Sequence, residues 1–114
     1  MSTSSKILEK VYESERKVAD LRKQMSVNPA KAPDIRRQMI ERLYALAIRC
    51  AQIGLKVAAR EHAAECIKML KERGSETLGD CATQTIRIGD ILVPGLLHEE
   101  VVKRDLAHYG VRMK

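Results

Sequence analysis

Residues 33–53 read PDIRRQMIERLYALAIRCAQI, and this stretch decides the fold. Apolar residues recur along one side of it at the 3.6-residue period of an α-helix, as Ile35, Met39, Leu43, Leu46, Cys50 and Ile53. A second apolar strip lies almost opposite and consists of Ile40, Tyr44, Ala47, Ile48 and Ala51. A helix that is apolar on two sides is covered from two directions. The sequence therefore predicts that residues 33–53 form the central helix of a bundle.

The preceding segment, from Ser4 to about Val27, has the pattern of a helix with a narrow apolar seam. The seam residues alternate at steps of four and three, as in a coiled coil, and are Ile7, Val11, Ser14, Val18, Leu21 and Met25. Such a seam buries too little surface for an isolated helix, so it must face a partner helix, in its own chain or in another copy. Because Pro29 and Pro33 break the pattern, we expect residues 1–31 to form an N-terminal helical arm and linker. Residues 32–114 are expected to form a helical core, within a single domain overall.

The rest of the chain predicts further helices. Gly54 interrupts the central helix, and a helical hairpin with its corner there is preferred over one long rod, with a helix over residues 57–73 that ends at Gly74. Residues 85–93 fit a short β-hairpin turning at Gly89–Asp90. Leu78, Ala82 and Ile86 lie at helical spacing, so strand and helix both stay open for residues 76–93. A last helix is expected over residues 96–109, ended by Gly110. The fold class is thus all-α, or mostly α: a small helical bundle of three to five helices with a coiled-coil-like N-terminal helix and a possible short β-hairpin near 85–93.

Composition limits the partners and the compartment. Lys and Arg number 21 against 15 Asp and Glu, a formal net charge of +6. Phe and Trp are absent, which nearly excludes aromatic platforms for stacking bases. No stretch approaches the roughly 20 apolar residues of a membrane span, and no apolar segment of a secretory signal follows Met1. Since Cys50, Cys66 and Cys81 are odd in number and widely spaced, we expect free thiols, a cytoplasmic location and no membrane contact.

The sequence offers little for catalysis or metal binding. His62 and Cys66 lie one helical turn apart, but no CxxC pair accompanies them, so we expect no metal and no cofactor. The motifs GxSxG, GxxxxGK[ST] and GxGxxG are missing, and no catalytic residue is predicted. Arg42 and Arg49 share one face of the central helix, which leaves open a small all-helical enzyme that binds an anionic substrate.

Two other hypotheses are preferred over an enzymatic function. The first is a non-catalytic helical interaction and assembly protein, an adaptor or scaffold, that self-associates, most simply as a homodimer, and binds another protein. Its predicted oligomer interface consists of Val11, Val18, Leu21, Met25, Ile40, Tyr44 and Ile48. The alternative is a basic accessory protein that binds nucleic acid. Its predicted phosphate contacts are Arg36, Arg37, Lys103 and Arg104.

Overall fold

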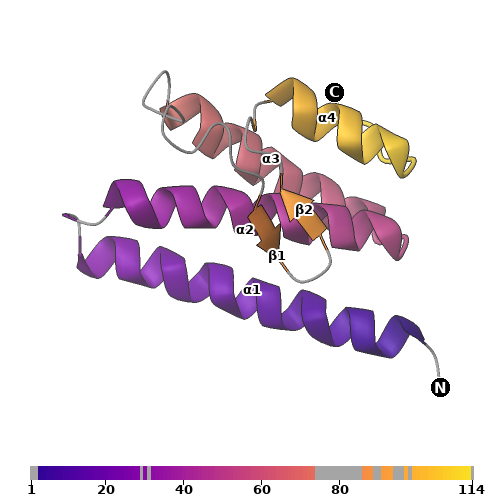
Figure 1. Cartoon of the computed structure of the whole chain (residues 1–114), viewed down its shortest axis with the longest axis horizontal. Coiled ribbons are helices and arrows are strands. Elements are labelled where there is room, and N and C mark those ends of the chain that lie inside the picture. Colours follow the sequence, from indigo (N-terminus) through magenta and orange to yellow (C-terminus); the bar gives the residue numbers. More distant parts are fainter. Residues whose placement is uncertain are drawn as a thin grey trace.

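The structure is a computed structural model, and it describes residues 3–28, 30, 32–73, 86–88, 91–93, 97 and 99–113. Its elements are α1 (Thr3–Val27), α2 (Ala32–Gln52), α3 (Lys56–Arg73), β1 (Ile86–Ile88), β2 (Ile91–Val93) and α4 (Glu99–His108). Helices α1, α2 and α3 lie side by side with α2 in the middle, and α4 lies at the opposite edge from α1 (Figure 1). The predicted class, a small helical bundle, is confirmed, with four helices in the described part of the chain.

The central position predicted for α2 is confirmed by its burial. The side chains of Leu43, Ala47 and Cys50 are fully buried. Small residues of α3 face these side chains of α2. Ala59 and Ala63 are also fully buried, and the Cys66 thiol lies 3.5 Å from the carbonyl oxygen of Ile40. Small side chains let two helix backbones approach closely, which explains why α2 and α3 form the most extensive helix pair of the molecule.

The seam of α1 packs against α2 of the same chain. Val11, Val18 and Leu21 are buried, and Met25 is partly buried against the same hydrophobic core. The side chain of Ile7 lies outside the described residues. Two ion pairs also link α1 to α3, one between Arg22 and Glu65 and one between Glu15 and His62, whose Oε2 and Nε2 atoms are 3.3 Å apart. The partner helix that the seam requires is therefore α2 of the same chain.

Gly54 forms the corner between α2 and α3, as predicted. Its φ of 85° is a left-handed conformation that suits a residue without a Cβ. The amide of Leu55 donates to the carbonyl oxygen of Cys50 at 2.9 Å, and the amide of Gly54 donates to that of Ala51 at 3.2 Å, which is the Schellman pattern of a helix C-terminus. Gly110, with a φ of 81°, ends α4 in the same way, whereas Gly74 lies outside the described residues.

The open choice between strand and helix is resolved as two paired strands at residues 86–88 and 91–93, while residues 76–85 lie outside the described residues. Strands β1 and β2 pair antiparallel, with Ile86 opposite Val93 and Ile88 opposite Ile91. The helical interpretation of this stretch is wrong, because Ile91 and Val93 alternate inward from β2 and are buried against α2. The predicted turn residues, Gly89 and Asp90, lie outside the described residues. Strand β2 and helix α4 therefore pack against α2, on the side that carries Tyr44 and Ile48.

Candidate functional site

The seven residues predicted to form an oligomer interface lie in the core of the single chain. Six of them are at most 5% exposed, and the seventh, Met25, packs partly buried against the same core; the six are Val11, Val18, Leu21, Ile40, Tyr44 and Ile48. The sequence predicted an interface here because one short chain has limited surface with which to cover the two apolar strips of α2 and the seam of α1. Secondary structure from the same chain covers them instead, so a second copy cannot reach these side chains without displacing α1, β2 or α4.

Three of the four predicted phosphate-binding residues are engaged in ion pairs. Arg37 pairs with Asp34 at 2.8 Å, and Lys103 pairs with Glu99 at 3.1 Å. The hydrogen bond from Lys103 lowers the pKa of the Glu99 carboxyl, as does the charge of Lys71 nearby. The fourth residue, Arg36, is half-buried near the start of α2, and its Nε atom is buried without a hydrogen-bond partner. Most of this positive charge is thus compensated locally.

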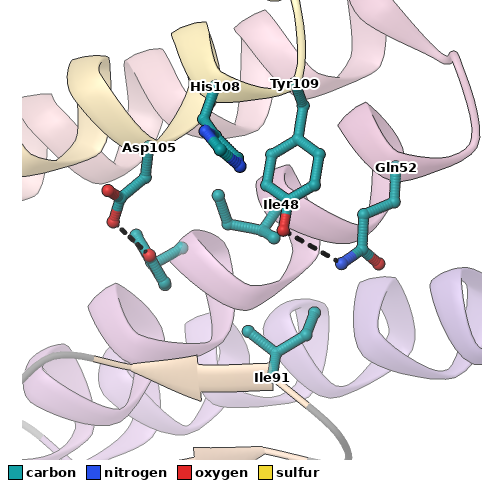
Figure 2. Close-up of a pocket in the computed structure, with 7 residues that line it drawn as sticks. Ile48, Gln52, Ile91, Asp105, His108 and Tyr109 are labelled. Carbon is teal, nitrogen blue, oxygen red and sulfur yellow. Dashed lines mark hydrogen bonds between the residues drawn. The ribbon is translucent and has the colours of Figure 1, made fainter.

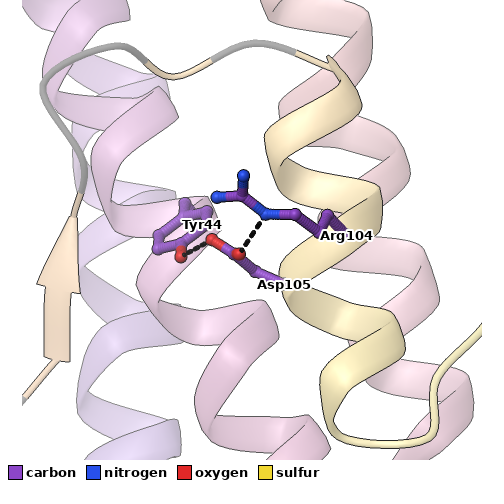
Figure 3. A network of polar contacts seen from close by, with 3 residues as sticks. All are labelled: Tyr44, Arg104 and Asp105. Atoms are coloured by element: carbon purple, nitrogen blue, oxygen red, sulfur yellow. Dashed lines mark hydrogen bonds and ion pairs between the residues drawn. The ribbon is translucent and has the colours of Figure 1, made fainter.

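Arg104, the remaining residue of that set, belongs to a polar network between α2 and α4 (Figure 3). Its Nε atom lies 3.3 Å from Oδ1 of Asp105, and the hydroxyl of Tyr44 donates to Oδ2 of the same carboxylate at 2.5 Å. Burial raises the pKa of the Tyr44 hydroxyl well above its ordinary value, and the hydrogen bond to Asp105 raises it further. Tyr44 is therefore a neutral donor that joins two helices across the core, a role that its apolar periodicity alone did not reveal.

Within the part of the chain that the structure describes, the residues considered for catalysis and metal binding do not form a shared site, and Cys81 lies outside that part. Arg49 is only 6% exposed and makes a polar interaction of its own. Arg42 lies about two helical turns earlier on α2 and is half-buried. Burial raises the pKa of the Cys50 thiol to about 11 and that of Cys66 to about 12, so both thiols are protonated at neutral pH. Among the residues that the structure describes, no three His, Cys, Asp or Glu side chains converge into a metal-binding group.

The side of α1 opposite its buried seam is exposed. We call this side the outer face of α1 and define it as Tyr12, Arg16, Ala19, Lys23 and Val27, with Glu13 and Asp20 at its flank. Tyr12 is 53% exposed and Val27 is 79% exposed. Sequence reasoning missed this face because it followed the stronger seam on the opposite side. The signal in the sequence was the presence of Tyr12 and Val27 among the charged residues on this side of the helix.

An open hollow adjoins the outer face where α1 and α2 converge. It has a volume of about 490 Å³ and is lined by Asp20, Lys23, Gln24, Val27, Asn28, Asp34, Ile35 and Gln38. The hollow therefore combines two residues of the outer face, Lys23 and Val27, with the first turns of α2. Exposed apolar side chains beside a hollow are a common feature of surfaces that contact another molecule.

Comparisons with known proteins identify no relative. No family model matches the chain, and neither a curated protein nor a solved structure matches it. Within the described part of the chain, none of the helices combines the length and the apolar character needed to cross a bilayer.

Proposed function

We propose that this protein is a non-catalytic helical assembly protein that self-associates as a dimer through the outer face of α1. The observation that carries the proposal is the exposure of Tyr12 and Val27 on a long helix whose other side is satisfied by α2. A helix of 25 residues is about 37 Å long at 1.5 Å per residue, which is enough for an extended helix-to-helix contact. The proposal keeps the self-association expected from the sequence and moves it from the buried strips to this exposed face.

The charges on the outer face favour an antiparallel pair. When two copies of α1 lie antiparallel with Val18 at the centre, Glu13 of one copy lies at the level of Lys23 of the second copy. Arg16 likewise lies at the level of Asp20 of the second copy. Two-fold symmetry repeats both pairs, so Arg16 and Lys23 of the outer face each lie at the level of an acidic residue of the second copy. In a parallel pair the same positions would place Glu13, Arg16 and Lys23 against their own equivalents, which is repulsive.

The same arrangement brings the apolar groups together. The ring of Tyr12 lies at the level of Gln24 of the second copy, one turn from its Val27. Gln24 and Val27 both line the hollow between α1 and α2, so the ring can contact the mouth of that hollow. Exposed ion pairs contribute only about 0.2 to 1 kcal/mol each, so the apolar contacts supply much of the affinity while the charges fix the orientation.

The test is a charge swap read by molar mass in solution. Light scattering at about 0.05 M salt should give twice the mass of one chain for the wild type, and at about 1 M salt the dimer should be weaker because the ion pairs are screened. Lys23→Glu places two acidic residues opposite each other and should give the mass of one chain. The double variant Glu13→Lys with Lys23→Glu restores opposite charges and should recover the dimer.

A matched control is Lys68→Glu, which makes the same change in net charge at an exposed position of α3 and should leave the dimer intact. Circular dichroism of all variants should be unchanged, because the substituted side chains are exposed. A mass of one chain for the wild type at high micromolar concentration and low salt would overturn the proposal. So would a double variant that fails to recover the dimer while Lys23→Glu loses it.

A further inference from the structure

A second concave site lies on the other side of the molecule, between α2, β2 and α4. It has a volume of about 280 Å³ and is lined by Tyr44, Ile48, Gln52, Ile91, Asp105, His108 and Tyr109. Figure 2 shows Asp105 and His108 of α4, with Tyr109 directly after that helix, on one side of the pocket. Ile91 of β2 lies on the opposite side, and Ile48 and Gln52 of α2 lie between them. Three segments far apart in the sequence therefore build one pocket.

The carboxylate of Asp105 is held in place at the edge of this pocket. Oδ2 accepts the hydroxyl of Tyr44 at 2.5 Å, and Oδ1 lies 3.3 Å from Nε of Arg104. The Asp105 side chain is still 23% exposed, so its oxygen atoms retain access from outside. Each carboxylate oxygen can accept more than one hydrogen bond. A carboxylate fixed by two neighbours and open on one side is a preorganised acceptor for a donor group.

Among the described residues that line the pocket, Asp105 alone carries a formal negative charge, and none is a Lys or an Arg. Arg104 does not line the pocket, and because its side chain is 73% exposed, solvent weakens its ion pair with Asp105. The remaining polar groups are neutral or weakly basic. The hydroxyl of Tyr109 accepts a long hydrogen bond from Nε2 of Gln52 at 3.4 Å, which leaves its proton available as a donor.

The rest of the pocket is apolar and aromatic. Ile48 and Ile91 form part of its wall, and the rings of His108 and Tyr109 meet edge to face, with centroids 5.3 Å apart and planes at 89°. Such an arrangement exposes both a ring face and aliphatic groups to a flat apolar body. Concave sites with apolar walls and a few fixed polar groups are typical of ligand pockets, and this volume suits a small molecule.

We propose that this pocket binds a small aromatic amine, with the ring between Ile48, Ile91 and Tyr109 and the ammonium group at the carboxylate of Asp105. The proposal is independent of α1 and of self-association, because no residue of α1 lines the pocket. An ammonium group supplies the donor that Asp105 lacks on its open side, and opposite charges reinforce that hydrogen bond.

The test compares three matched ligands by two-dimensional NMR of the amide groups. Phenethylamine is a cation at pH 7, 2-phenylethanol is its neutral counterpart and phenylacetate is its anionic counterpart. We expect phenethylamine to shift the amide signals of Ile48, Ile91 and Tyr109 with a Kd on the order of 1 mM, as for a small fragment. 2-Phenylethanol should bind roughly tenfold more weakly, and phenylacetate should not bind measurably.

The variant Asp105→Asn tests the carboxylate directly. It keeps an oxygen that accepts the Tyr44 hydroxyl but removes the charge, and it should weaken phenethylamine roughly tenfold to the level of 2-phenylethanol. The control Glu100→Gln removes an exposed carboxylate of α4 outside the pocket and should leave binding unchanged. If the Asp105→Asn variant unfolds, the comparison of the three ligands on the wild-type protein still tests whether the pocket prefers a cation. Absence of shifts at the pocket residues, or equal binding of phenylacetate and phenethylamine, would overturn the proposal.

Discussion

The hydroxyl of Tyr44 donates a hydrogen bond to Oδ2 of Asp105 at 2.5 Å, and this contact joins the central helix to the last one across 61 positions of sequence. Tyr44 is 4% exposed and its partner is half-buried, so water replaces the bond only in part when it is broken. A hydrogen bond to a charged group in such a place is worth more than an exposed one.

Tyr44→Phe should lower the free energy of unfolding by about 1 to 2 kcal/mol, because it leaves a half-buried carboxylate without its strongest donor. Urea denaturation followed by circular dichroism measures the change. Tyr109→Phe is the matched control, since it removes a hydroxyl whose 3.4 Å contact with Gln52 is exposed, and it should change stability by less than about 0.5 kcal/mol. Equal effects of the two variants would contradict the role assigned to Tyr44.

The two buried thiols should be protected from thiol reagents in the folded protein. Cys50 and Cys66 are fully buried, and burial raises the pKa of their thiols to about 11 and about 12. In a Cys81→Ser background, a colorimetric disulfide reagent at pH 8 should react with less than one thiol within minutes, and with both at once in denaturant. Fast reaction of either thiol under native conditions would show that the core at α2 and α3 opens readily.

The same pKa shifts predict a loss of stability at alkaline pH. In the unfolded chain these thiols ionise at about pH 8.5 to 9, whereas in the folded protein they keep their protons to higher pH. The unfolded state therefore binds fewer protons, and each thiol should lower the free energy of unfolding by up to about 1.4 kcal/mol per pH unit between about pH 9 and pH 11. Below pH 8 the contribution is constant. Urea denaturation at a series of pH values measures the slope, which should be shallower in a Cys50→Ala, Cys66→Ala double variant.

Gly54→Ala should destabilise the protein by about 1 kcal/mol through backbone conformation alone. The φ of Gly54 is 85°, and a Cβ placed there would meet no atom within 4 Å, so steric contact with other residues adds nothing. Gly54→Asn should cost less, because Asn adopts the left-handed region more readily than Ala. Thermal unfolding compares the two variants, and equal costs would argue against this explanation.

Short-range patterns in the sequence were sufficient for several elements. The two apolar strips of residues 33–53 identified the central helix, because a 3.6-residue period places such residues on defined sides of a helix whatever packs against them. Gly54 and Gly110 marked helix ends for an equally local reason, since a left-handed backbone conformation favours glycine wherever it occurs. Periodicity did not separate strand from helix over residues 76–93, because Ile86 fits both the strand pattern with Ile88 and the helical spacing with Leu78 and Ala82.

Tertiary structure alone decided what covers each apolar surface. The sequence required a partner for the seam at Val11 and Val18 and for the strip at Tyr44, but periodicity specifies a side of a helix and not the segment that meets it. Burial by α2, β2 and α4 of the same chain turned the expected interface into core and left the opposite side of α1 exposed. The pocket at Asp105 also depends on contacts between residues far apart in sequence, which no local pattern encodes. The local sequence thus determines where each helix begins and ends. Which surfaces stay exposed, and can therefore bind another molecule, depends on how the helices and strands pack together.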